Sequence, residues 1–565
     1  MNGKKLFGKS AAILVMLAVV IFGVVYGGIT LTKNWGKSED VVVSENANED
    51  LDKVYKNIKV NIIEPVKESV NLINSTLKDT LPDIEKYPAQ VENTTSDFIE
   101  IFASVEKTGE GKDGWLVDVA NDFNKAGIEV NGKKASVKVR GLSSGMGMDY
   151  IVSKKHIPDG YTPSNELWGE MLKSKGIEVT LSDERIVGNV AGVLISKDKH
   201  SELVKKYGSI NLKNITDAVA SNEIAMGYTN PLSSATGLNF LVSTLSTFDG
   251  ENILSESAVA GFEKFQNNIP FVAYTTLQMR EAAEGGGLDG FIMEYQTYVN
   301  SPGLKSNYVF TPFGVRHDSP LYEIDNLSDD KKAILNKFIE FYKDDKYKEM
   351  ALDYGFNNFD DYNSEAEPVN GDTIIEAQKL WKEKKNGNKK ISAVFVADIS
   401  GSMQGKPLNE LKKSLLNGSQ YIGEENSIGL VTYSDDVNIN LPIGKFDINQ
   451  RSLFTGAVNN MESGGSTATF DGISVAVKML MEEKAKNPDA KLMLFVLSDG
   501  EINKGHSLND IEGILRSFKI PVYTIGYNAD IEVLKSISSI NEAASINADS
   551  DDVVYTLGSL FNAEM

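Results

Sequence analysis

Five oxygen-bearing side chains in the last third of the chain lie beside apolar runs or glycines, and they are Asp398, Ser400, Ser402, Thr467 and Asp499. The first three form an Asp-x-Ser-x-Ser run directly after the apolar residues 394–397. Thr467 ends a Gly-Gly-Ser-Thr stretch, and Asp499 follows the apolar run 492–497. Carboxylates and hydroxyls without Cys or His are the ligands that hard cations prefer. The pattern therefore predicts a site for Mg²⁺, with Mn²⁺ or Ca²⁺ as alternatives.

The elements predicted around these residues bring them to one edge of a sheet. Asp398 and Asp499 each follow an apolar strand, and ligands of an open parallel sheet bind beyond the carboxyl ends of its strands. Ser400 and Ser402 are two positions apart, so in an extended loop both hydroxyls face the same side. Thr467 shortly precedes a predicted helix. A local alternative is that Asp398, Ser400 and Thr467 only cap helices and close turns, where these residue types are favoured.

Taken in order, the five residues resemble the metal-ion-dependent adhesion site of von Willebrand factor type A domains, and the resemblance covers about residues 389–565. It implies that Ser400, Ser402 and Thr467 contact the metal directly. It also implies that Asp398 and Asp499 act directly or through water, and that an open coordination position accepts an Asp or Glu of a protein partner. Mg²⁺ suits that role because it commonly keeps waters that a ligand oxygen can replace.

A second set of hydroxyls follows strands and precedes helices in the middle of the chain, and it comprises Ser104, Ser143, Ser144, Ser233 and Ser234. The last four stand in Gly-Leu-Ser-Ser-Gly and Pro-Leu-Ser-Ser-Ala turns. A hydroxyl-rich turn at a helix N-terminus offers N–H donors and the positive end of the helix dipole to an anion. We therefore expect these serines to converge on a ligand cleft, with ordinary helix capping as the alternative for each.

Residues 97–365 resemble bacterial extracellular solute-binding proteins of the two-lobed type, through these serine turns and the late helical segment 346–358. The resemblance implies a small ligand between two lobes. The loop 141–145 departs from the tighter Gly-Ser-Gly of oxyanion binders, so the ligand class stays open. Glu294 follows the apolar residues 291–293 and could face the cleft, where it would favour a cationic or peptide-like ligand. The alternative places Glu294 on the surface.

Strands alternate with helices along the whole chain, which predicts an α/β protein with mainly parallel sheets. The middle part is expected to be a two-lobed periplasmic-binding-protein-like domain, in which the apolar segment 186–195 crosses between the lobes. The last part is expected to be a doubly wound, Rossmann-like sheet with strands at 391–397, 427–433, 492–497 and 521–525. Asp435 and Asp436 are interpreted as turn residues near the edge that carries the metal site.

The N-terminus predicts a membrane anchor. Lys4, Lys5 and Lys9 precede a charge-free run at 10–32 that is long enough to span a bilayer. We expect an uncleaved transmembrane helix with the bulk of the chain outside the cell, at a single-pass cell-membrane location. A cleaved signal peptide is the alternative, because glycines follow the apolar run.

The expected boundaries are a cytoplasmic tip and transmembrane anchor at 1–35, a partly helical stalk at 36–96, the solute-binding-like domain at 97–365, a helical linker at 366–388 and the von Willebrand factor type A domain at 389–565.

The composition and the missing motifs exclude several classes of function. The net charge of −22 argues against nucleic acid as a partner, and the absence of cysteine excludes disulfides and thiol chemistry. The four histidines are scattered without metal-ligand spacing, and neither a phosphate-binding Gly-rich loop nor a Gly-x-Ser-x-Gly stretch occurs. We therefore expect no enzyme activity.

The combined interpretation is a membrane-anchored extracellular binding protein. Its metal site would bind an acidic group of a protein partner, and its solute-binding-like domain would sense a small ligand. One alternative is a transporter-associated solute-binding protein whose last domain only tethers it. Another is an adhesive surface protein with a vestigial cleft.

Overall fold

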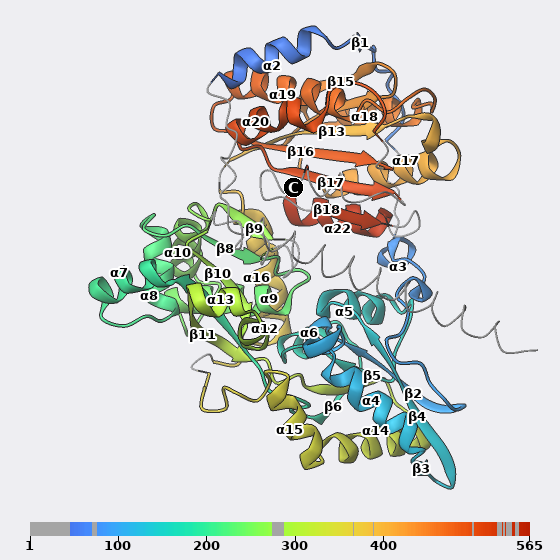
Figure 1. The fold of residues 1–565 in the computed structure, drawn as a ribbon, viewed down its shortest axis with the longest axis vertical. Coiled ribbons are helices and arrows are strands. Elements are labelled where there is room, and N and C mark those ends of the chain that lie inside the picture. Colours follow the sequence, from blue (N-terminus) through green and yellow to red (C-terminus); the bar gives the residue numbers. More distant parts are fainter. Residues whose placement is uncertain are drawn as a thin grey trace, which may run out of the picture.

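The computed structural model describes residues 46–70, 76–273, 288–364, 367–387, 389–499, 502–527, 545–548 and 553–565, together with Met279, Leu534 and Ile537. Its described strands form three sheets, of seven, six and five strands. Figure 1 shows the seven-stranded sheet in a unit at one end of the molecule and the two smaller sheets in separate lobes at the other.

The seven-stranded sheet has the order β1-β15-β14-β13-β16-β17-β18. Its strands are β1 (Val60–Ile62), β13 (Ile391–Asp398), β14 (Ser427–Tyr433), β15 (Val437–Lys445), β16 (Lys491–Ser498), β17 (Val522–Tyr527) and β18 (Ser545–Ala548). Its helices are α2 (Ala47–Lys56), α17 (Lys406–Gly418), α18 (Ile448–Asn459), α19 (Thr469–Lys486), α20 (Leu508–Phe518) and α22 (Val553–Glu564). The central strand β13 pairs parallel with both β14 and β16.

Successive side chains of β13 point to opposite faces of the sheet and enter two different cores. Phe395 and Ala397 pack with α17, α18 and α22 on one face. Val394 and Val396 pack with α2, α19 and α20 on the other. Burial on both faces explains why residues 393–397 of β13 are all apolar. The expected doubly wound arrangement is therefore present, with helices on both sides of the sheet.

Three strands of this sheet, β1, β15 and β18, have no counterpart among the expected ones. β15 pairs antiparallel with β14 and is only partly buried, so its sequence lacks the apolar run that marks the central strands. β18 is a short strand at the opposite edge, parallel to β17. The four strands that were expected are all present, within two residues of their predicted ends.

Part of the segment expected to be a stalk instead belongs to this unit. The helix α2 packs on α19 and α20, and β1 pairs with β15 from Val60↔Val437 to Ile62↔Ile439. The helix of this segment stops at Lys56, and residues 60–62, two of them β-branched, form a strand. The chain contributes to the last unit before it enters the lobes, as the blue segment at the top of Figure 1 shows.

The first lobe has the sheet order β3-β4-β2-β5-β12-β6. Its strands are β2 (Asp97–Ala103), β3 (Glu129–Val130), β4 (Lys133–Gly141), β5 (Gly160–Thr162), β6 (Val179–Asp183) and β12 (Leu321–Ile324). Its helices are α3 (Leu77–Thr80), α4 (Trp115–Ala126), α5 (Ser144–Ser153), α6 (Leu167–Ser174), α14 (Asp329–Tyr342) and α15 (Asp345–Asp353).

The second lobe has the sheet order β11-β7-β10-β8-β9. Its strands are β7 (Val190–Ser196), β8 (Met226–Thr229), β9 (Phe271–Ala273), β10 (Gly290–Glu294) and β11 (Tyr308–Arg316). Its helices are α7 (Lys197–Tyr207), α8 (Leu212–Ala220), α9 (Ala235–Phe248), α10 (Glu256–Gln266), α12 (Tyr295–Asn300) and α13 (Pro302–Asn307).

The chain crosses between the lobes where the sequence predicted it. Ile186 and Val187 pack in the core of the first lobe, and β7 begins three residues later in the sheet of the second. The expectation of mainly parallel sheets is only partly correct. The central pairs β2–β4, β2–β5 and β8–β10 are parallel, but β7 and β12 run antiparallel to their neighbours.

The expected linker is a long helix, α16 (Gly371–Lys384), that packs on both lobes. Trp381 is fully buried and donates its indole N–H to the Tyr228 hydroxyl at 2.7 Å, and Gln378 donates to the Pro231 carbonyl at 2.8 Å. The following Lys385 is buried too.

The expected transmembrane anchor at 1–35 lies outside the described residues. Among the helices of the described part, none is both long and apolar enough to cross a membrane.

Candidate metal centre and interlobe site

Asp398 ends the central strand β13 and is completely buried. Its Oδ1 accepts the Ser400 N–H at 2.8 Å. Its Oδ2 accepts the Ser498 hydroxyl at 2.8 Å and the Tyr433 hydroxyl at 3.3 Å. Residues at the ends of three neighbouring strands therefore fix this carboxylate at the edge of the sheet.

Burial raises the pKa of the Asp398 carboxyl to about 6, and the nearby Asp499 charge adds to the shift. The hydrogen bonds from Ser400 and Ser498 oppose it. The contacts that orient Asp398 are neutral donors, so none of them supplies a positive charge to balance the carboxylate. A cation bound at this edge would do so.

Ser400 and Ser402 bring their hydroxyls together, with 3.0 Å between the two Oγ atoms. Ser400 is buried and Ser402 is exposed, so the pair spans the boundary between the sheet edge and solvent. Ser400 precedes a short 3₁₀ helix, but its side chain does not cap that helix. The capping alternative therefore does not explain Ser400.

Thr467 lies in the loop that leads into α19, and it is buried. The residue that precedes the first turn of α19 is Ala468, and no side chain caps this helix. The Thr467 N–H donates to the Asn503 Oδ1 at 2.8 Å, which ties the loop to the segment after β16. Capping therefore does not explain Thr467 either.

The glycines before Thr467 join this loop to the serine loop. The Gly464 N–H donates to the Ile399 carbonyl at 2.8 Å, and the Gly401 N–H donates to the Gly465 carbonyl at 3.0 Å. Gly465 has a φ of +85°, which favours glycine. Asp435 supports the same loop, because it accepts the Ser466 N–H at 3.3 Å and pairs with Lys504 at 2.9 Å.

Asp499 follows β16 and provides the test of whether a cation fits. Its Oδ1 atom is buried and has no hydrogen-bond partner. An unpaired buried carboxylate oxygen is costly, and a cation at the same edge would satisfy it. Among the described residues, no group of three or more His, Cys, Asp or Glu side chains is placed to hold a metal ion. The candidate set has a different composition, with two carboxylates and three hydroxyls. That donor set suits a hard cation.

The structure also adds residues that the sequence did not single out as contributors. Tyr433 and Ser498 orient Asp398, and Asn503 holds the Thr467 loop. Ser498 stands next to Asp499 in the motif and could have been inferred from that position. Tyr433 and Asn503 carry no local signal, because their roles depend on the packing of separate strands.

The serine turns of the two lobes are in contact. The Gly145 N–H donates to the Ser233 carbonyl at 3.2 Å, and a Cβ atom at Gly145 would lie 2.7 Å from the Leu232 carbonyl oxygen. Ser143 and Ser234, however, accept N–H donors of their own helices, α5 and α9. Those two serines are therefore caps, which was the local alternative.

The other predicted cleft serines have internal partners. Ser144 is buried, and its Oγ accepts the Ser164 N–H at 3.4 Å. Ser104 is buried, accepts from the Lys107 ammonium and donates to Glu106. Lys107 is itself fully buried and lies 3.2 Å from the Glu106 carboxylate. Burial lowers the pKa of Lys107, although the charges of Glu106 and Glu294 oppose the shift.

Glu294 lies at the end of β10 and is buried, so the alternative that placed it on the surface is wrong. Its Oε1 accepts the Thr236 hydroxyl at 3.1 Å and contacts His317 Nδ1 at 2.8 Å. Its Oε2 accepts the Asn189 amide at 3.2 Å. His317 is also buried, and it takes part in this cluster of hydrogen bonds.

The tautomer of His317 follows from its neighbours. Asn239 accepts the Val315 N–H at 3.0 Å through Oδ1, so its amide nitrogen faces His317 Nε2 at 3.1 Å. Asn165 also directs its amide nitrogen at Nε2, at 3.1 Å. Nε2 therefore accepts, and the proton on Nδ1 donates to Glu294. This interlobe network (Lys107, Asn165, Asn189, Thr236, Asn239, Glu294 and His317) joins both lobes through their own side chains.

The seven-stranded unit at the end of the chain is similar to a known protein family. Residues 393–562 match the von Willebrand factor type A domain. The human inter-alpha-trypsin inhibitor heavy chain H3 is 29% identical over 175 residues, which are 28% of this chain and 19% of that protein. This chain thus spans about a fifth of the length of that relative.

Solved structures resemble each part of the chain. A von Willebrand factor type A protein from Catenulispora acidiphila aligns at 16% identity and a TM-score of 0.28, over 31% of this chain and 42% of that one. A periplasmic thiamin-binding protein aligns at 10% identity and a TM-score of 0.38, over 52% of this chain and 99% of that one. The six-stranded and five-stranded sheets of this chain define its two lobes.

Proposed function

We propose that the von Willebrand factor type A domain of this chain binds a divalent cation at Asp398, Ser400, Ser402, Thr467 and Asp499, and through it an acidic group of a protein partner. The observation that carries the proposal is the buried Oδ1 of Asp499, which lacks a partner beside a second buried carboxylate. Two carboxylates without a balancing cation are otherwise an unfavourable pair.

Each residue has a distinct part in this proposal. Asp398 supplies charge from inside the sheet, where Ser498 and Tyr433 hold it in place. The exposed Ser402 marks the side from which a partner approaches. The bound cation would supply a Lewis-acidic position for a carboxylate of the partner, and Mg²⁺ suits this because it retains replaceable waters.

The setting of this domain is also part of the proposal. We infer an outward-facing protein that residues 10–32 anchor in the cell membrane, and a binding rather than a catalytic role. This is supported by the lysines before the apolar run and by the absence of a catalytic motif in the sequence.

The interlobe network favours a two-lobed clamp that is held closed by its own side chains. It argues against a clamp that binds a solute between the lobes and delivers it. Glu294 and His317 are hydrogen-bonded where the lobes meet, and the charge of Glu294 acts on the buried Lys107. A solute at that point would have to replace several of these contacts.

Thermal unfolding of the full chain, first with EDTA and then with added Mg²⁺ or Mn²⁺, tests the metal site. Binding to the native state alone raises the melting temperature, by an amount equivalent to about 2.7 kcal/mol at a hundredfold excess over Kd. We expect this rise in the wild type and its loss in Asp499→Asn. Because Asp499 Oδ1 makes no hydrogen bond, the metal-free stability of that variant should change little.

Ser466→Ala is the matched control. It removes a hydroxyl from the same turn but keeps the backbone N–H that Asp435 accepts, so the metal response should persist. An equal rise in Asp499→Asn and wild type would sink the proposal.

A further inference from the structure

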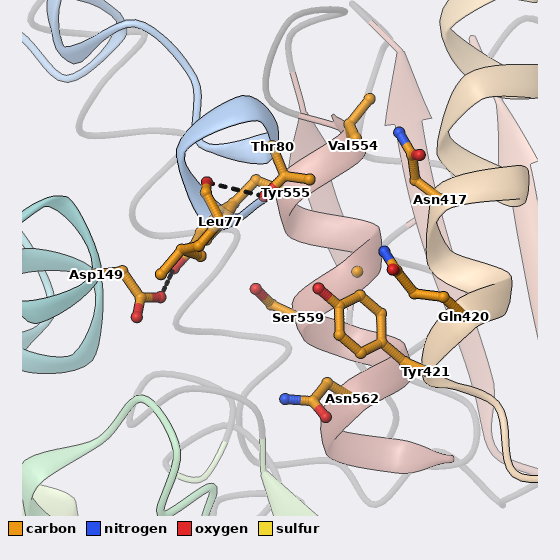
Figure 2. A pocket seen from close by; sticks show the side chains of 11 residues that line it. Leu77, Thr80, Asp149, Asn417, Gln420, Tyr421, Val554, Tyr555, Ser559 and Asn562 are labelled. Carbon is orange, nitrogen blue, oxygen red and sulfur yellow. Dashed lines mark hydrogen bonds between the residues drawn. The ribbon is translucent and has the colours of Figure 1, made fainter. Parts of the chain in front are cut away.

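A cavity of about 330 Å³ lies where the two lobes, α16 and α22 meet. A second cavity of about 150 Å³ adjoins it and extends between α17, α22 and the start of the first lobe. The two share the lining residues Leu77, Asp149, Tyr555, Ser559 and Asn562. Figure 2 shows the second cavity, with Asp149 on one side and the side chains of Ser559, Tyr421 and Gln420 on the other.

The larger cavity has one strongly apolar wall. Met146 and Met148 of α5 line it together with Trp168 and Met171 of α6. Methionines adapt their shape to a ligand, and an indole face attracts both apolar groups and cations. This wall belongs entirely to the first lobe.

The opposite side of the cavity is polar and comes from the von Willebrand factor type A domain. Tyr555, Ser559 and Asn562 lie on successive turns of α22 and line the cavity. The Tyr555 hydroxyl donates to the Asp149 Oδ2 at 2.7 Å, which is a direct bond between the domain and the first lobe (dashed in Figure 2).

Two polar side chains of the cavities have hydrogen-bonding groups without partners. Trp168 is almost completely buried, and its Nε1–H lacks an acceptor. In the adjoining cavity, the Gln420 Nε2 is also buried and unpaired. Buried donors of this kind are normally satisfied, so each cavity has room for a further group beside its polar wall.

Asp149 points to a positive charge in a ligand. Its carboxylate accepts from Tyr555, a neutral donor, and burial raises its pKa to about 6. At neutral pH the group is therefore mostly ionised inside the junction. Among the described residues that line the larger cavity, Lys175 is the one cationic side chain, and it is exposed. Burial, and not a nearby charge, is the main cause of the raised pKa of Asp149.

We propose that this junction cavity binds a small organic cation with an apolar body. Its ammonium group would lie beside Asp149, and its apolar body would pack against Met146, Met148 and Trp168. The volume is at the lower end of that of known small-molecule sites. Such a ligand touches the first lobe and α22 at once, so it would hold the von Willebrand factor type A domain against the clamp. This site is separate from the proposed metal centre.

Three probes of similar shape and different charge test the proposal: phenethylamine, 2-phenylethanol and 3-phenylpropionate. Binding to the full chain is measured by calorimetry and by thermal unfolding in EDTA, which keeps the result independent of the metal centre. We expect the amine to raise the melting temperature and to bind at least about tenfold more tightly than the alcohol, and the acid not to bind.

Two variants locate the binding. Asp149→Asn should lose about tenfold or more in amine affinity, and Ser559→Phe, which fills the cavity from α22, should abolish binding. Asp345→Asn removes an exposed carboxylate that does not line the cavity and is the matched control, with affinity within a few-fold of wild type. Equal binding of the three probes, no binding of the amine, or full amine affinity in Asp149→Asn would overturn the proposal.

Discussion

At the scale of single residues, the loops at 399–403 and 464–468 keep their hydroxyls available because other groups satisfy the turns around them. Glycine N–H groups join the serine loop to the Thr467 loop, and Asp435 and Asn503 accept further backbone donors. The side chains of Ser400 and Thr467 are thereby not used as caps. Local hydrogen bonding of this kind separates a binding loop from an ordinary capped turn.

The interlobe network shows the same principle with charged groups. Glu294 accepts three hydrogen bonds, and His317 is fixed as the neutral tautomer with a proton on Nδ1. Every residue of the network has a hydrogen-bond or charge partner, but the Oδ1 atom of Asn165 has no hydrogen bond. Networks that are almost fully satisfied rigidify the elements they connect.

His317→Ala should therefore destabilise the lobes by about 2–4 kcal/mol, because Glu294 loses a donor and two asparagine amides lose their acceptor. Denaturant unfolding measures this change. His200→Ala on α7, which lies outside the network, is the control and should stay within about 0.5 kcal/mol of wild type. A loss below about 1 kcal/mol for His317→Ala would show that the network does not hold the lobes.

At the scale of elements, the first described segment of the chain completes the last domain. Leu51 of α2 is buried against the core formed with α19 and α20, and β1 covers the exposed edge of β15. Covering an edge strand protects it from pairing with other chains. The lobes are therefore inserted between two parts of the seven-stranded unit.

Leu51→Ala should lower the stability of this unit by about 2–4 kcal/mol, as expected for a large-to-small change in a core. Denaturant unfolding of the full chain measures this loss. Lys53→Ala on the same helix changes an exposed side chain and is the control. Equal effects of the two variants would mean that α2 does not pack as described.

At the scale of the whole molecule, α16, α22 and the lobes meet at a junction that contains buried charges. Asp149 bonds to Tyr555 across it, and Lys385 after α16 lies near Glu564 at the end of α22. Burial lowers the pKa of Lys385 to about 7, although the Glu564 charge opposes the shift. The relative position of the domains is therefore sensitive to charge at this junction.

The pH dependence of stability tests Asp149. Its folded-state pKa of about 6 lies above the ordinary value of 3.8, so the folded state binds more protons between these values. Stability at this site should fall as pH rises from about 4 to above 6, by up to about 3 kcal/mol. Asp149→Asn removes that loss, so the variant should be more stable than wild type at pH 7.5 and similar at pH 3.5. Thermal unfolding at both pH values measures it, and an unchanged pH profile in the variant would contradict the assignment.

The sequence by itself determined the parts of this protein that depend on local patterns. Apolar runs such as 391–397 mark central strands because both of their faces are buried, and the positions of Asp398 and Asp499 directly after such runs place them at one sheet edge. The serine turns were likewise found from their neighbours in the sequence, although Ser143 and Ser234 proved to be caps.

Only the tertiary structure decided the contacts between distant residues. Glu294 is buried among Asn189, Thr236 and His317, and no local sequence pattern predicts those partners. The pairing of β1 with β15 and the bond between Asp149 and Tyr555 join residues several hundred positions apart. Hydrophobic periodicity reports which face of an element is buried, but not against which element it packs. The interlobe network, the insertion of the lobes into the seven-stranded unit and the junction cavity all depend on which elements pack against each other.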